Sequence, residues 1–75
     1  MDWKPFIYTR LDDDWGVLHR PTETVIAEDC NKGEAAGFAM ILNGNETAGW
    51  ECVGYKTKRR QAKLAILRSI AVNLR

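Results

Sequence analysis

Five basic side chains lie close together near residue 60 of this 75-residue chain: Lys56, Lys58, Arg59, Arg60 and Lys63. Ammonium and guanidinium groups bind anions, and a guanidinium pairs with phosphate through parallel hydrogen bonds. On a helix, Lys63 would lie one turn beyond Arg59 and Arg60, so the three would share one end of that helix. The spacing therefore favours a phosphate-binding surface.

A helix over residues 58–74 would position these cations, with Thr57 as its N-cap. Cations in a first turn oppose the helix dipole by a few tenths of a kcal/mol each. Two interpretations stay open, because a solvated surface tolerates that cost and a bound external anion would remove it. The pattern predicts an apolar stripe that packs on a sheet, with Gln61, Arg68 and Arg75 on the opposite side; the stripe consists of Ala62, Ile66, Leu67, Ile70, Ala71 and Leu74.

The charges divide along the chain, although the net charge is only +1. Residues 1–55 hold all ten acidic residues and four basic ones, whereas residues 56–75 hold seven basic residues and no acidic one. A basic segment of this kind is typical of a protein with a polyanionic partner, and it is equally compatible with attraction between two parts of one domain.

Short apolar, β-branched or aromatic runs precede the predicted helix and have the length of strands. Three aspartates, at residues 12–14, predict a solvated turn after the first run, and Asn43 with Gly44 predicts another turn. The pattern indicates an α+β fold in which three to four antiparallel strands pack against one long C-terminal helix, in the order βββα. The strand candidates are residues 6–11, 24–28, 37–42 and 49–55.

Length and composition limit the remaining possibilities. Seventy-five residues with 45% hydrophobic side chains predict one folded domain over residues 1–75, too small for a separate cofactor-binding fold, and we expect no cofactor. The N-terminus lacks the pattern of a signal peptide and no apolar run could span a membrane, so we expect a cytoplasmic protein. Cys30 and Cys52 form no CxxC pair and are predicted to be buried or half-buried thiols.

Catalytic chemistry has little support in the sequence. His19 is the single histidine, which excludes a site built on several histidines, and no nucleophile stands beside it in the sequence. Adjacent aspartates at residues 12–14 point apart and do not have the spacing of a calcium loop. We therefore expect a protein that is not an enzyme and holds no metal.

The basic segment resembles the start of the last helix of the double-stranded-RNA-binding domain, whose pattern is G-x-G-x-S-K-K-x-A-K-x-x-A-A. Gly54, Arg59, Arg60, Ala62 and Lys63 match that pattern at the same spacing. The resemblance implies that Arg59, Arg60 and Lys63, flanked by Lys56 and Lys58, contact phosphates across the major groove of duplex RNA.

An earlier segment resembles the same family. "GVLHRP" places Gly16, His19 and Pro21 in register with the family's G-P-x-H-x-P loop between its first two strands, after a strand that contains Tyr8. The resemblance implies that His19, with Arg20 in its loop, approaches 2′-hydroxyl groups in the minor groove. Only five residues precede the first predicted strand, so the chain is similar to a form of this domain without its first helix.

Two alternatives stay open. The arm-binding domain at the N-terminus of phage-type integrases also has a sheet and a helix that opens with T-K-K/R-x-A, which would make the partner DNA. The other alternative is a small protein-binding module or inhibitor, of a size typical of phage-encoded proteins, whose acidic strands or basic helix meet a protein partner. The sequence leaves the oligomeric state open.

Overall fold

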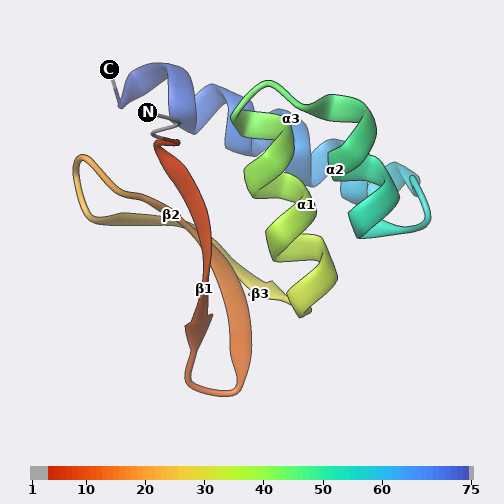
Figure 1. The fold of residues 1–75 in the computed structure, drawn as a ribbon, viewed down its shortest axis with the longest axis horizontal. Coiled ribbons are helices and arrows are strands. Elements are labelled where there is room, and N and C mark those ends of the chain that lie inside the picture. The colour runs from red at the N-terminus through yellow and green to blue at the C-terminus, as the bar shows by residue number, and fades with distance from the viewer. Residues whose placement is uncertain (1–3, 75) are drawn as a thin grey trace.

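The computed structural model describes residues 4–74, and the position predicted for Arg75 lies outside them. Three antiparallel strands are followed by three helices (Figure 1). The predicted α+β class, with a three-stranded sheet and a long C-terminal helix, is confirmed. The elements are β1 (Phe6–Leu11), β2 (Asp14–His19), β3 (Thr24–Cys30), α1 (Lys32–Leu42), α2 (Glu46–Val53) and α3 (Lys58–Asn73).

The sheet has the order β1-β2-β3, so β2 is central. Strand β1 begins and ends where the sequence predicted, and Phe6 and Leu11 pair with His19 and Asp14. The predicted strand at residues 24–28 is confirmed as part of β3. Residues 16–19, expected in a loop between strands, instead belong to β2, so that prediction was wrong. Trp15, Val17 and His19 are every second residue and all contact the core, which is the spacing expected of a strand.

The strands predicted at residues 37–42 and 49–55 are wrong, because these residues lie mainly in α1 and α2. A capping box starts α1: the Asn31 side chain accepts from the Glu34 N–H over 2.8 Å, and Glu34 Oε1 accepts from the Asn31 N–H over 3.0 Å. This reciprocal pair satisfies two N–H groups at the helix start. The predicted turn at Asn43 and Gly44 exists, but it joins two helices.

Glycines allow α1 and α2 to pack closely. A Cβ on Gly49 would lie 2.6 Å from the Gly37 carbonyl oxygen, and a Cβ on Gly37 would lie 2.9 Å from the Val53 nitrogen. Gly54 then ends α2 with φ of 98°, a conformation that glycine adopts without steric cost. These glycines therefore fit a tight helix pair rather than strands.

The core lies between the sheet and α1, where Val17 and Phe38 are the largest fully buried side chains. Helix α3 adds Leu64 and Leu67, with Ile70, Ala71 and Leu74 partly buried beside them. The predicted stripe was therefore misplaced at its N-terminal half. Ala62 and Ile66 are exposed, because the face that contacts the core runs through Leu64.

The two cysteines differ in their surroundings. Cys30 is buried, as predicted, whereas Cys52 is exposed on α2, which corrects the prediction of a buried or half-buried thiol. Burial raises the pKa of the Cys30 thiol, although the nearby Lys63 ammonium acts in the opposite direction.

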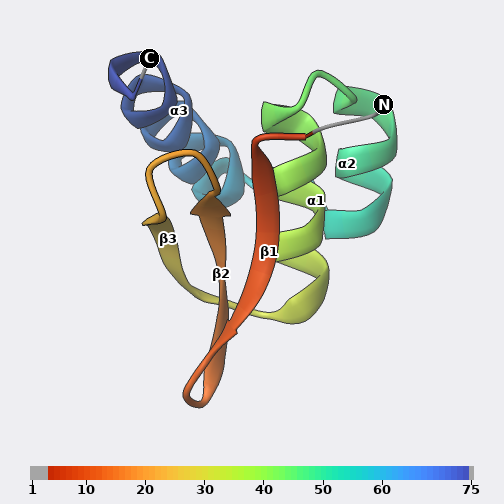
Figure 2. The ribbon, with the colours of Figure 1, turned by 60° about the vertical axis from the view of Figure 1, so that its left-hand side comes forward.

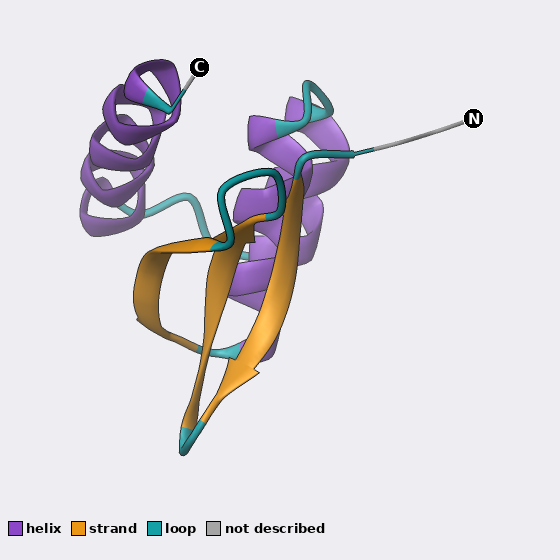
Figure 3. Cartoon of the chain, turned by 90° about the vertical axis from the view of Figure 1, so that its left-hand side faces the viewer, coloured by secondary structure: helices purple, strands orange, loops and turns teal. Residues whose placement is uncertain are grey.

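In Figure 2, α1 lies behind β1, α2 lies on the side of α1 away from β1, and α3 lies above the β2–β3 end of the sheet. The β1–β2 hairpin extends beyond the helices (Figure 3). None of the helices in residues 4–74 has the length and apolar character needed to cross a membrane.

Candidate nucleic-acid interface

The start of α3 is held by several hydrogen bonds. Thr57 is the N-cap, as predicted, and its Oγ1 accepts from the Arg60 N–H over 3.2 Å. Arg60 Nη1 donates to the Tyr55 carbonyl oxygen over 2.9 Å, and Gln61 Nε2 donates to that of Lys56 over 3.1 Å. The segment that carries the basic residues is therefore tied to the first turn of the helix.

Two of the predicted cations attach α3 to the rest of the protein. Arg60 Nε lies 3.0 Å from Glu34 Oε2, and their side chains are only 21% and 18% exposed. Lys63 Nζ donates to the carbonyl oxygen of Glu28 over 2.9 Å. Arg60 and Lys63 thus connect the first two turns of α3 to α1 and β3, and the charge of Arg60 is balanced by Glu34.

The ion pair changes the pKa of Glu34. Partial burial of the carboxyl raises this pKa, whereas the hydrogen bonds from Asn31 and Arg60 and the charge of Arg60 lower it. The favourable interactions prevail, so the pKa of Glu34 lies below its ordinary value. Glu34 is therefore ionised at neutral pH and remains a counterion to Arg60.

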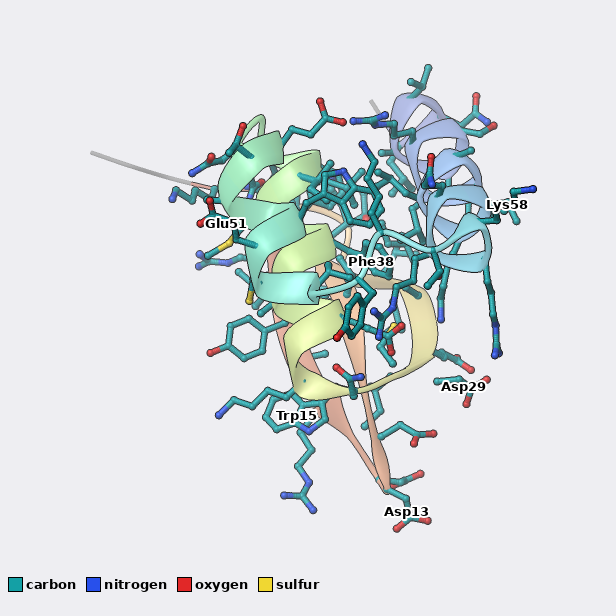
Figure 4. The ribbon with its side chains drawn as sticks, turned by 90° about the vertical axis from the view of Figure 1, so that its right-hand side faces the viewer. Asp13, Trp15, Asp29, Phe38, Glu51 and Lys58 are labelled. Atoms are coloured by element: carbon teal, nitrogen blue, oxygen red, sulfur yellow. The ribbon has the colours of Figure 1, made fainter. Side chains whose placement is uncertain are left out.

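The other three cations are exposed: Lys56, Lys58 and Arg59. Within residues 4–74 the ion pairs are Arg60–Glu34 and Arg68–Glu46, so Lys58 and Arg59 have no acidic partner there. Lys56 Nζ lies 5.2 Å from the centroid of the Trp50 ring, within range of a cation–π interaction. Figure 4 shows Lys58 pointing away from the body of the protein. These three side chains can meet a ligand without breaking an ion pair.

A hollow of about 640 Å³ lies beside them, and its lining has mixed charge. Asp29 and Glu34 line it together with Arg59, Arg60 and Lys63, whereas Lys56 and Lys58 lie outside the lining. Since Glu34 is paired with Arg60, Asp29 is the carboxylate that would repel a polyanion inside the hollow, so the outer side of the helix start is the more favourable contact surface. The full lining consists of Asp29, Glu34, Tyr55, Thr57, Arg59, Arg60 and Lys63.

Tyr55, which was predicted to be the last residue of a strand, is an aromatic residue at this surface. It is 84% exposed and directly precedes the cations. Exposed aromatic rings among cations provide stacking surfaces for bases. The signal in the sequence was the aromatic residue immediately before a basic run.

His19 and Arg20 lie elsewhere. His19 is only 8% exposed, its Nδ1 lies 2.8 Å from Thr22 Oγ1, and its ring packs on Phe6 with 5.1 Å between centroids. His19 lines a hollow with Arg68, which is in the second half of α3. Lys58 and Arg68 are ten residues apart on this helix, so about 15 Å of helix lies between the basic start of α3 and the part of α3 near His19. Since His19 is turned inward, Arg20 is the exposed residue of this pair.

Within residues 4–74, no group of three His, Cys, Asp or Glu side chains is arranged to hold a metal ion. Comparisons of the chain with protein-family models, with curated proteins and with solved structures found no match.

Proposed function

We propose that this chain is a non-enzymatic nucleic-acid-binding protein that contacts the phosphate backbone with Lys56, Lys58 and Arg59. The observation that carries the proposal is the exposure of these three cations at the start of one helix, with no ion pair to Lys58 or Arg59 among residues 4–74. Helix N–H groups and the helix dipole add positive potential at the same end.

The anchoring of α3 supports this role. Arg60 and Lys63 fix the helix to α1 and β3, so the exposed cations project from a held segment and lose less conformational freedom on binding. Duplex RNA is the ligand that the family resemblance favours, with Arg20 as a second, separate contact. Duplex DNA is the alternative nucleic acid.

The small number of free cations sets the expected binding properties. Three neutralised phosphates give a log–log salt slope of about −2.7 on B-DNA, and sequence-independent contacts of this kind bind with Kd values of roughly 10⁻⁴ to 10⁻⁶ M. Contacts to phosphate position the protein without reading the sequence. We expect weak, salt-sensitive binding with little sequence preference.

The test is a titration of labelled duplex RNA, duplex DNA and single-stranded RNA of matched sequence, followed by fluorescence anisotropy at two salt concentrations. The double variant Lys58→Ala/Arg59→Ala should reduce affinity at least tenfold and lower the salt slope by about two. Arg68→Ala is the control. It also removes a cation from α3, but this cation already pairs with Glu46 and lies away from the proposed contact surface.

Binding that is unaffected by the double variant, or no binding to any of the three nucleic acids at low salt, would contradict the proposal. Tyr55→Ala tests the contribution of stacking. A loss confined to single-stranded RNA would assign Tyr55 to base stacking and single strands as the preferred ligand.

A second candidate is a protein-binding module or inhibitor that acts on a protein partner. The observation that favours it is the exposure of Ile66 and Val72, at 61% and 62%, on the outer side of α3. Under this hypothesis Ile66→Glu abolishes binding of the partner, whereas Lys58→Ala/Arg59→Ala leaves it unchanged.

A further inference from the structure

The free edge of β1 is occupied at one end by a side chain. Phe6 donates its N–H to Asn43 Oδ1 over 3.1 Å, and its carbonyl oxygen accepts from Asn43 Nδ2 over 2.8 Å. The carboxamide of Asn43 thus pairs with Phe6 as a neighbouring strand would. The main-chain groups of Phe6 therefore point away from β2.

Hydrogen-bonding direction alternates along an antiparallel strand, so the main-chain groups of Tyr8 and Arg10 point to the same outer edge. No hydrogen bond between elements in residues 4–74 reaches these groups. The opposite edge, on β3, is different, because Lys63 binds the Glu28 carbonyl oxygen and the β2–β3 pairing is irregular. Irregular pairing and a lysine are common protections of an edge strand. Strand β1 is therefore the more open edge of the sheet.

A groove of about 260 Å³ runs beside this edge, between β1 and α1. Its walls are mainly apolar, and Tyr8 and Met40 are exposed on them. The apolar residues are Phe6, Ile7, Tyr8, Ala36, Ala39 and Met40.

The charged residue that lines the groove, among residues 4–74, is Lys4, which lies there with Asn43 and Asn45, and the lining includes no carboxylate from that part of the chain. Arg10 is exposed further along β1, before the acidic turn at residues 12–14. Asn45 makes no side-chain cap to α2, so its carboxamide is not used there. A ligand that fills the groove would therefore gain from an apolar side chain next to negative charge.

We propose that β1 binds an extended acidic segment of another protein as a fourth strand, with an apolar side chain of that segment in the groove. Tyr8 and Arg10 would form about four main-chain hydrogen bonds with it, and Asn43 would end the ladder at Phe6. Lys4 and Arg10 would face its carboxylates.

The probe is a fluorescein-labelled heptapeptide with a central leucine flanked by glutamates. One control peptide has lysines in place of the glutamates, and another carries N-methyl groups on alternate amides, which removes main-chain donors without changing side chains. We expect the acidic peptide to bind at least tenfold more tightly than either control. Its amide shift changes in ¹⁵N-HSQC spectra should lie at Tyr8, Arg10 and residues 36–40.

Substitutions locate the site independently. Met40→Glu places a carboxylate on the groove and should weaken peptide binding at least tenfold. Val72→Glu is the control, since it changes an apolar residue on α3 that is more exposed than Met40, at 62% against 39%, and should have no effect on peptide binding. Equal binding of the N-methylated peptide, shift changes confined to α3, or no binding at millimolar peptide would overturn the proposal. A concentration-dependent dimer in which the Tyr8 and Arg10 amides are protected from hydrogen exchange would also overturn it, because a second copy of the chain would then occupy this edge.

Discussion

Arg60 and Glu34 connect the first turns of two helices: the guanidinium Nε donates to Glu34 Oε2 over 3.0 Å, while the other carboxylate oxygen accepts from the Asn31 N–H. One carboxylate therefore completes the capping box of α1 and also fixes the start of α3. Because the proposed phosphate contacts are the neighbours of Arg60, the geometry of the candidate site depends on this ion pair.

Glu34→Gln tests the contribution of the ion pair to stability. Glutamine keeps an oxygen for the Asn31 N–H but has no charge for Arg60, so the capping box is retained. We expect the free energy of unfolding to fall by about 1 kcal/mol, as for a partly buried, charge-assisted hydrogen bond. Urea denaturation of the wild type, Glu34→Gln, Arg60→Gln and the double variant measures the coupling. Additive losses from the two single variants would contradict it.

The pH dependence of stability follows from the lowered pKa of Glu34. A carboxyl whose pKa is lower in the folded than in the unfolded state stabilises the fold above its ordinary pKa, and this contribution is lost as the pH falls through the folded-state value. The difference in Tm between wild type and Glu34→Gln should therefore be largest near neutral pH and shrink as the pH falls below the ordinary carboxyl pKa of 4.5. A difference that stays constant over this range would show that the charge of Glu34 is not the cause.

Asp29→Asn should raise Tm at neutral pH. A hydrogen bond with the Asp29 side chain, followed by desolvation and the charges of Asp29 and Asp13, raises the pKa of Asp14. A raised carboxyl pKa means that ionised Asp14 is disfavoured in the fold, so the gain from the substitution should disappear as the pH falls and Asp14 becomes protonated. Asparagine also tolerates the φ of 56° at this position. Asp13→Asn is the control and should have a smaller effect.

Asp29→Asn should also strengthen binding to RNA under the proposed function. Asp29 lines the hollow that Arg59 also lines, so removing its charge removes a repulsion from the phosphate backbone. We expect a severalfold lower Kd at low salt and a smaller change at high salt, because screening weakens repulsion between exposed charges. Anisotropy titrations at two salt concentrations measure both values. An unchanged or higher Kd at low salt would be evidence against contact at this end of α3.

The sequence predicted those features that depend on residues close together in the chain. The Thr57 cap, the helix after it and the position of the basic cluster all follow from local spacing. Which cations are free could not be predicted, because Arg60 and Lys63 meet Glu34 and Glu28, 26 and 35 residues away. Similarly, the buried side chain of His19 depends on Phe6 and Thr22, which no motif places against it.

The mistaken strands have a more specific cause. Asn31 and Glu34 carry the spacing of a capping box, which was a sufficient signal for a helix start at α1. The strand interpretation depended on the short apolar runs at residues 37–42 and 49–55, and glycines at 37 and 49 are unfavourable within helices. Their presence is explained only by the close approach of two helices, which is a tertiary feature.

Gly37→Ala tests that explanation. In an exposed helix this change usually stabilises a protein by up to about 1 kcal/mol, because alanine is the better helix former. In α1 the added methyl group would meet the main chain of Gly49 and Val53, which can yield only if the helices move apart. We therefore expect the opposite sign, a loss of roughly 1 to 3 kcal/mol in the free energy of unfolding, measured by urea denaturation. Gly49→Ala should behave in the same way, since its methyl group would meet the Gly37 carbonyl oxygen. Increased stability in both variants would mean that α1 and α2 do not need the small residues at their contact, and that these glycines have another purpose.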